Sequence, residues 1–160
     1  MRVAISGSHS VGKTTLINAI NSPYKKIDEI ARQVIQHKLP HEMSEQEFTE
    51  FEIRVLKKQI ELEKGSFIID RSVYDILAYS KGHECYKQIK EMVKNHKGYD
   101  VIFYIPIEFK LKKDKIRKND ENYREEIDKQ IVKILKNKNV VELNGNLENR
   151  LKGVYKWRKI

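Results

Sequence analysis

The chain of 160 residues is 39% hydrophobic and 34% charged, which fits one soluble globular domain and excludes a membrane-embedded protein. Its net charge of +9, from 32 basic and 23 acidic residues, indicates attraction to polyanions such as nucleotides or nucleic acid. One cysteine excludes an intrachain disulfide, and the first residues lack a signal-peptide pattern, so we expect a cytoplasmic protein.

Short apolar segments alternate with helical patterns along the chain, which is typical of an α/β fold with a parallel sheet. In chain order, strands are expected at residues 2–6, 25–28, 66–70, 100–105 and 139–143. Helices are expected at 14–21 and 30–38, from a cap at Ser44 to Gly65, at 83–96 and 121–137, and from a cap at Asn146 through Val154. No linker or repeat divides residues 1–160, so a single domain is predicted.

The segment between the first strand and the first helix reads G-S-H-S-V-G-K-T at residues 7–14. In this G-x-x-x-x-G-K-[ST] pattern, main-chain N–H groups and the helix dipole surround phosphate oxygens. The lysine would lie by the β- and γ-phosphates, and the hydroxyl of Thr14 would ligate Mg²⁺. We therefore predict a phosphate-binding loop (P-loop) formed by Gly7, Ser8, His9, Ser10, Val11, Gly12, Lys13, Thr14 and Thr15.

A second signal lies at the end of the third expected strand, where residues 67–72 read F-I-I-D-R-S. An acid at the carboxyl end of a buried strand lies beside the crevice where open α/β sheets bind ligands. Asp70 could therefore hold Mg²⁺ or polarise an attacking hydroxyl, and the planar guanidinium of Arg71 could face the phosphates. The alternative is a helix-capping Asp70 beside a surface arginine.

The sequence favours ATP over GTP as the nucleotide. GTPases need a D-x-x-G switch and an N-K-x-D segment that binds the guanine edge. Residues 70–73 contain no glycine, and residues 137–140 read N-K-N-V, without the aspartate.

These motifs resemble those of the P-loop nucleoside and nucleotide kinases. Residues 70–79, D-R-S-V-Y-D-I-L-A-Y, look like the D-R-x…A-Y segment of thymidylate kinases and the E-R-S segment of deoxynucleoside kinases. Residues 5–16 and 29–32 are similar to ATPase domains of the ribosylnicotinamide-kinase type. The resemblance implies a three-layer P-loop NTPase fold, in which a five-stranded parallel sheet carries helices on both faces.

The resemblance also implies an acceptor site. Glu29 would be the acid near the acceptor, and either Glu29 or Asp70 could take the proton of an acceptor hydroxyl. Arg32 and Arg71 could bind an acceptor phosphate, with Tyr74 as a further substrate contact. For Arg32, a surface position on a helix is the alternative.

A mobile lid is implied at about residues 107–125, because such kinases close a basic segment over ATP after the fourth strand. Arg117 and Arg124 would be its arginines, presented to the transferring phosphoryl group. A plain charged helix pair is the alternative for these two residues. Asn144 and Gly145, after the last strand, would contact adenine through backbone groups.

The leading hypothesis is a kinase that transfers the γ-phosphoryl of MgATP to a small nucleotide or nucleoside. A (deoxy)nucleoside monophosphate is the favoured acceptor, and a nucleoside 5′-hydroxyl is the next. A polynucleotide 5′-kinase would use the basic residues 110–118 to bind nucleic acid, which is not favoured. A non-catalytic ATP-dependent switch or binding module is a further alternative. A homodimer stays open, and no membrane partner is expected.

Overall fold

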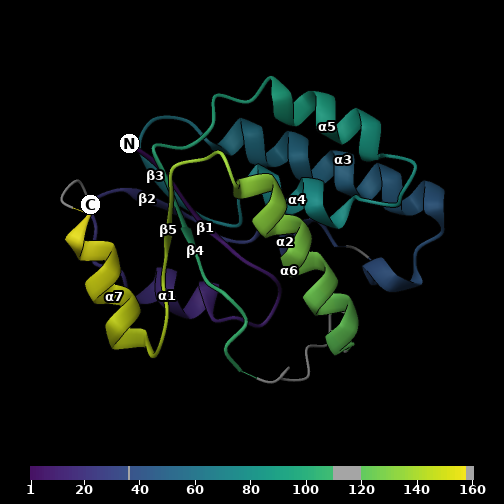
Figure 1. Cartoon of the computed structure of the whole chain (residues 1–160). Helices are drawn as coiled ribbons and strands as arrows, with labels where there is room; N and C mark the ends of the chain where they lie inside the picture. The colour runs from purple at the N-terminus through teal and green to yellow at the C-terminus, as the bar shows by residue number, and fades with distance from the viewer. Residues whose placement is uncertain (36, 110–119, 158–160) are drawn as a thin grey trace.

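The computed structural model describes residues 1–35, 37–109 and 120–157. Within these ranges the chain forms a parallel five-stranded sheet in the order β2-β3-β1-β4-β5 (Figure 1). The strands are β1 (Arg2–Ser6), β2 (Lys25–Ile27), β3 (Phe67–Asp70), β4 (Val101–Tyr104) and β5 (Val140–Glu142). The predicted parallel sheet is confirmed.

Helices cover both faces of this sheet, so the predicted three-layer α/β architecture is confirmed (Figure 1). The helices are α1 (Lys13–Ala19), α2 (Ile30–Val34), the short 3-10 helix η1 (Pro40–Glu42), α3 (Glu45–Leu62), α4 (Val73–Tyr79), α5 (Tyr86–Lys94), α6 (Glu121–Leu135) and α7 (Leu147–Lys156). Helices α1 and α7 pack on one face through a core that includes Leu16, Ile17 and Val154. Helices α2 to α6 pack on the other face, with Phe51, Leu56 and Ile131 in the core.

The strand register brings two predicted site segments to the same edge of the sheet. β1, β3 and β4 are buried along nearly their whole length, because helices cover both of their faces. Ile5 of β1 pairs with Asp70 of β3, and Ser6 pairs with Tyr104 of β4. The loop that follows β1 and the acid that ends β3 are therefore neighbours.

Two of the helix caps follow the sequence prediction. Ser44 accepts a hydrogen bond from the Glu47 N–H and completes a capping box at the start of α3. Asn146 caps α7 by accepting from the Asn149 N–H. Helix α4 was not predicted, because every one of its residues is buried and the segment shows no amphipathic period.

The remaining helix predictions differ from the structure in extent. α2 ends at Val34, four residues before the expected end at residue 38. α5 begins at Tyr86, after a turn that includes His83, instead of beginning at residue 83. No helix in the described part of the chain is long and apolar enough to cross a membrane.

Candidate active site

The loop between β1 and α1 has the backbone of a phosphate-binding loop. Gly7 and Gly12 adopt φ values of 142° and 96°, which disfavour residues with a Cβ atom. A Cβ at Gly7 would also lie 2.5 Å from the carbonyl oxygen of Ile105, at the end of β4. Glycine at position 7 is therefore required by both conformation and space.

Lys13 lies inside this loop. Its side chain is only 5% exposed, and Nζ donates hydrogen bonds to the carbonyl oxygens of Gly7 and Ser8 at 3.0 and 2.7 Å. The loop thus concentrates positive charge at the start of α1, where the N-terminal dipole of the helix adds to it. This geometry fits a triphosphate.

Asp75 of α4 anchors the start of the loop and was missed by the sequence analysis. The side chain is fully buried, and its carboxylate accepts from Ser6 Oγ at 2.8 Å and from the Gly7 N–H at 3.0 Å. It also accepts from the Ser72 N–H at 2.8 Å. The Ser-x-x-Asp spacing at the start of α4 is the signal that could have revealed this cap.

Arg124 braces the loop from α6 and does not present its charge to the site. Its side chain is 0% exposed, with Nε donating to the His9 carbonyl at 3.1 Å and Nη1 donating to the Phe109 carbonyl at 2.9 Å. It also pairs with Glu121 at 3.1 Å. These contacts occupy the buried guanidinium, whereas the predicted lid role would require it to reach the transferring phosphoryl group.

The Arg124→Leu variant should lose both stability and ATP affinity. Removing the guanidinium leaves buried carbonyl groups without donors, which is expected to lower the free energy of unfolding by about 1–3 kcal/mol. Urea unfolding and calorimetric titration with ATP measure the two effects. Arg54→Leu, at an exposed position of α3, is the control. An unchanged unfolding midpoint in Arg124→Leu would contradict the bracing role.

Arg150 of α7 braces the loop from the opposite side and was also missed. Its Nη1 donates to the Val11 carbonyl at 2.7 Å, and its Nη2 pairs with Glu108 at 2.6 Å. Glu108 accepts in turn from the Gly145 N–H at 2.7 Å. The Gly145 N–H is therefore already occupied, so a backbone contact from Gly145 to adenine would have to use its carbonyl group. The side chain of Asn144 donates to Glu142 at 3.0 Å, which leaves its predicted backbone contact a prediction.

Two oxygen-bearing side chains lie in contact beside the loop. Thr14 Oγ1 donates to Asp70 Oδ2 at 2.5 Å. Asp70 is 2% exposed, and its other oxygen has no hydrogen-bond partner among the described residues. A hydroxyl beside a half-satisfied carboxylate fits Mg²⁺, which prefers oxygen ligands and keeps several waters. No cluster of three or more His, Cys, Asp or Glu side chains suited to a metal occurs in the described ranges.

Glu29, Arg32 and Arg71 form the predicted acid–arginine group at the same edge of the sheet. Arg71 Nε lies 2.9 Å from Glu29 Oε1, and Arg32 Nε donates to Glu29 Oε2 at 2.9 Å. The guanidinium of Arg71 also stacks 4.7 Å above the ring of Tyr79. Burial acts to lower the pKa of Arg71, but Tyr79 outweighs it together with Asp75 and Asp70, so the pKa is raised.

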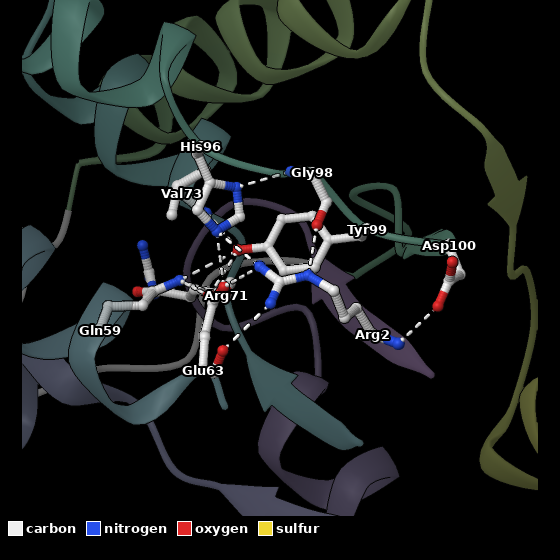
Figure 2. A network of polar contacts seen from close by, with 9 residues as sticks. All are labelled: Arg2, Gln59, Glu63, Arg71, Val73, His96, Gly98, Tyr99 and Asp100. Carbon is white, nitrogen blue, oxygen red and sulfur yellow. Dashed lines mark hydrogen bonds and ion pairs between the residues drawn. The ribbon is translucent and has the colours of Figure 1, made fainter. Parts of the chain in front are cut away.

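Hydrogen bonds to the main chain at and after Arg71 fix the position of this arginine. Its φ of 82° is uncommon for a residue with a Cβ atom. The Arg71 carbonyl accepts from Gln59 Nε2 at 3.1 Å, and the hydroxyl of Tyr99 accepts from the Val73 N–H at 2.9 Å (Figure 2). Gln59 of α3 and Tyr99, which precedes β4, thus fix the turn that carries the arginine.

Glu63 is the centre of this network, which Figure 2 shows between α3 and the starts of β1 and β4. Its carboxylate lies 2.9 Å from Gln59 Nε2 and accepts from the Tyr99 hydroxyl at 2.7 Å. It also pairs with Arg2 at 3.0 Å and with His96 at 2.7 Å. Burial raises the pKa of Tyr99, which therefore stays a hydroxyl donor.

One predicted site residue, Tyr74, is not brought to this group. The ring of Tyr74 packs edge-on against Tyr99 with centroids 6.0 Å apart and lies under Lys138 Nζ at 4.8 Å. Those neighbours precede β4 and β5, at the opposite edge of the sheet, so Tyr74 is left out of the acceptor site. Arg117 and most of the predicted lid at 107–125 lie outside the described residues.

Comparison with known protein families assigns the chain to one family. Residues 2–150 match the family described as AAA domain, a range that includes the P-loop, Asp70 and Arg150. The chain belongs to the AAA domain family. No curated protein sequence matches it.

Solved structures resemble this AAA domain at low sequence identity. NadR in complex with NR superposes with a TM-score of 0.72 and 18% identity, over 99% of this chain and 50% of NadR. Deoxyadenosine kinase from M. mycoides gives 0.75 and 15%, over 98% and 97% of the two chains. Thymidylate kinase from Candida albicans gives 0.64 and 18%, over 97% and 89%. The chain has the fold of these P-loop proteins and spans about half the length of NadR.

Proposed function

We propose that this AAA domain is an ATP-dependent kinase, which transfers the γ-phosphoryl of MgATP to a small nucleotide or nucleoside. One observation carries the proposal: the Glu29–Arg71 pair lies at the same sheet edge as Lys13 and the Thr14–Asp70 pair. The first pair suits an acceptor, and the other three residues suit a metal-bound triphosphate.

The donor side is built for a triphosphate. The ammonium of Lys13 and the N–H groups of the P-loop would neutralise and orient the phosphates. When bound at Thr14 and Asp70, Mg²⁺ would neutralise charge on the β- and γ-phosphates. The absence of a guanine-reading N-K-x-D sequence favours adenine. NadR has been solved with AMP-PNP, which supports an ATP-type donor for this fold.

The acceptor side favours a (deoxy)nucleoside monophosphate. Arg71 and Arg32 are both held by Glu29, and an incoming phosphate would offer the two guanidinium groups a second anionic partner. A phosphate acceptor is already ionised at neutral pH, so its transfer needs charge neutralisation and no strong base. The deoxyadenosine kinase of M. mycoides was solved with dCMP and dCDP as products, which supports a nucleotide-sized acceptor site.

A nucleoside hydroxyl is the second candidate, because Glu29 is a carboxylate on the acceptor side. In that reaction the hydroxyl oxygen bonds to the γ-phosphorus as the bond to ADP breaks. The hydroxyl proton passes to the Glu29 carboxylate. Asp70, bonded to Thr14, is left to the metal side.

A coupled assay for ADP release tests the proposal. The protein is given MgATP with each common nucleoside and nucleoside monophosphate in turn. We expect acceptor-dependent turnover with one class and little ATP hydrolysis without acceptor. Tight ATP binding with no acceptor-dependent turnover would contradict the proposal and favour the non-catalytic switch.

A further inference from the structure

Glu52 is a buried carboxyl group that the site described above does not use. It lies on the inner face of α3 and is only 7% exposed, among apolar neighbours that include Val55. In the described part of the chain it makes no hydrogen bond and no ion pair. Buried polar groups without partners are rare in folded proteins, and a bound ligand, a buried water or a catalytic role can account for them.

A small cavity of about 20 Å³ adjoins this carboxyl. Side chains from α2, α3 and α4 line it together with Arg71, so it opens directly behind the proposed acceptor side. The volume is enough for one group the size of a water molecule. Its lining residues are Ile30, Ala31, Glu52, Val55, Gln59, Arg71, Ile76 and Tyr79.

The other polar groups of the cavity are already engaged. Gln59 Nε2 donates to the Arg71 carbonyl at 3.1 Å and lies 2.9 Å from Glu63. The guanidinium of Arg71 pairs with Glu29 at 2.9 Å and donates to the Tyr79 hydroxyl at 3.4 Å. Glu52 is therefore the group that stays available to a ligand.

Burial also sets the protonation state of Glu52. The pKa is raised to about 8 by loss of solvent, against the field of Arg71, which lowers it. The other titratable groups that face this region are Tyr79 from α4 and Cys85 at the start of α5. At neutral pH the neutral carboxyl thus offers one O–H donor and one carbonyl acceptor.

We propose that Glu52 binds the exocyclic amino group of the acceptor's ring in this cavity, so that the acceptor is a cytosine or adenine nucleoside or its monophosphate. The inference rests on the proposed kinase function and names its substrate class.

The chemistry of the ring edges supports this class. Cytosine and adenine present an amino group beside a basic ring nitrogen, which matches the acceptor and donor of a neutral carboxyl group. Guanine presents two adjacent donors and would need an ionised carboxylate, which burial opposes. Thymine and uracil also pair a donor with an acceptor, their ring N–H and a carbonyl oxygen, but they have no amino group to place in the cavity.

Calorimetric titration without ATP tests the inference on the full chain. The ligands are deoxycytidine, deoxyadenosine, deoxyguanosine and thymidine, together with their monophosphates. We expect the cytosine or adenine ligand to bind the unmodified protein at least about tenfold more tightly than the thymine and guanine ligands. Glu52→Leu should abolish this preference, because losing one hydrogen-bonding group lowers affinity by about tenfold. Glu52→Gln should restore most of it, since an amide keeps one donor and one acceptor.

Glu61→Gln is the matched control, because Glu61 is exposed on the same helix, and it should keep both affinity and preference. Two further readouts separate ligand binding from a structural role. Glu52→Leu should raise Tm by about 2–4 °C, since an unpartnered buried carboxyl is removed. Affinity of the unmodified protein for the amino ligand should fall as pH rises past about 8, as the O–H donor is lost, and Glu52→Gln should not show this fall.

The outcomes distinguish this inference from the kinase proposal. If turnover occurs but Glu52→Leu keeps the ligand preference, Glu52 holds at most a buried water, and only the inference fails. If amino ligands bind through Glu52 without turnover, the kinase proposal alone fails. A preference for thymine or guanine ligands, or no binding by any of the four bases, would overturn the inference.

Discussion

Replacing Lys13 by alanine is expected to lower ATP affinity by about 100-fold or more and to abolish the proposed phosphoryl transfer. The ammonium lies in the loop at 3.0 and 2.7 Å from two main-chain carbonyls, where it would meet the β- and γ-phosphates. A charge-assisted hydrogen bond to a phosphate contributes about 1.5–3 kcal/mol, and Lys13 can donate more than one. Calorimetric titration with MgATP measures the loss.

Lys26→Ala is the control for this change. Lys26 lies on β2, where Nζ donates to the Asn18 carbonyl at 3.2 Å at an exposed position. Lys26→Ala changes the net charge by the same amount as Lys13→Ala and leaves the loop intact. ATP affinity should therefore stay within about twofold, as expected for a screened surface charge. Equal losses in the two variants would assign the effect to overall charge and refute the role given to Lys13.

The donor half of the site could be predicted from the sequence because local rules fix it. A glycine-rich turn between an apolar strand and a helix constrains the backbone so strongly that Lys13 and Thr14 are placed by their spacing. Parallel pairing then brings Asp70 to the same edge, since carboxyl ends of neighbouring strands align. The Thr14–Asp70 contact follows from these two facts.

The supports of the site could not be predicted in this way. Arg124 reaches the His9 carbonyl across 115 residues, and Arg150 reaches the Val11 carbonyl across 139 residues. In the sequence both are ordinary charged residues of amphipathic helices, and no neighbouring residue indicates that these arginines are buried. Glu52 is hidden for the same reason, because one acid on a helix with many charges looks like part of a solvated face.

If the proposed kinase function holds, the Glu29→Gln variant is expected to show which acceptor class the protein uses. Glu29 holds Arg71 and Arg32 at 2.9 Å each, and it is also the carboxylate of the proposed acceptor side. With a hydroxyl acceptor, loss of the base should lower kcat by about 10²- to 10⁴-fold. With a monophosphate acceptor no proton is removed by the enzyme, so kcat should fall far less and KM should change as the arginines lose their anchor.

Asp70→Asn gives the matched comparison, because Asp70 is a second acid at the same edge that bonds to Thr14. If Asp70 serves the metal, its variant should lose turnover with either acceptor class and should regain part of it at high Mg²⁺ concentration. A Glu29→Gln enzyme should not respond to added Mg²⁺. Reversed responses, with magnesium rescuing Glu29→Gln and not Asp70→Asn, would exchange the two roles. Glu29 pairs with both arginines, whereas Asp70 contacts the P-loop hydroxyl of Thr14. These contacts favour Glu29 on the acceptor side and Asp70 on the metal side.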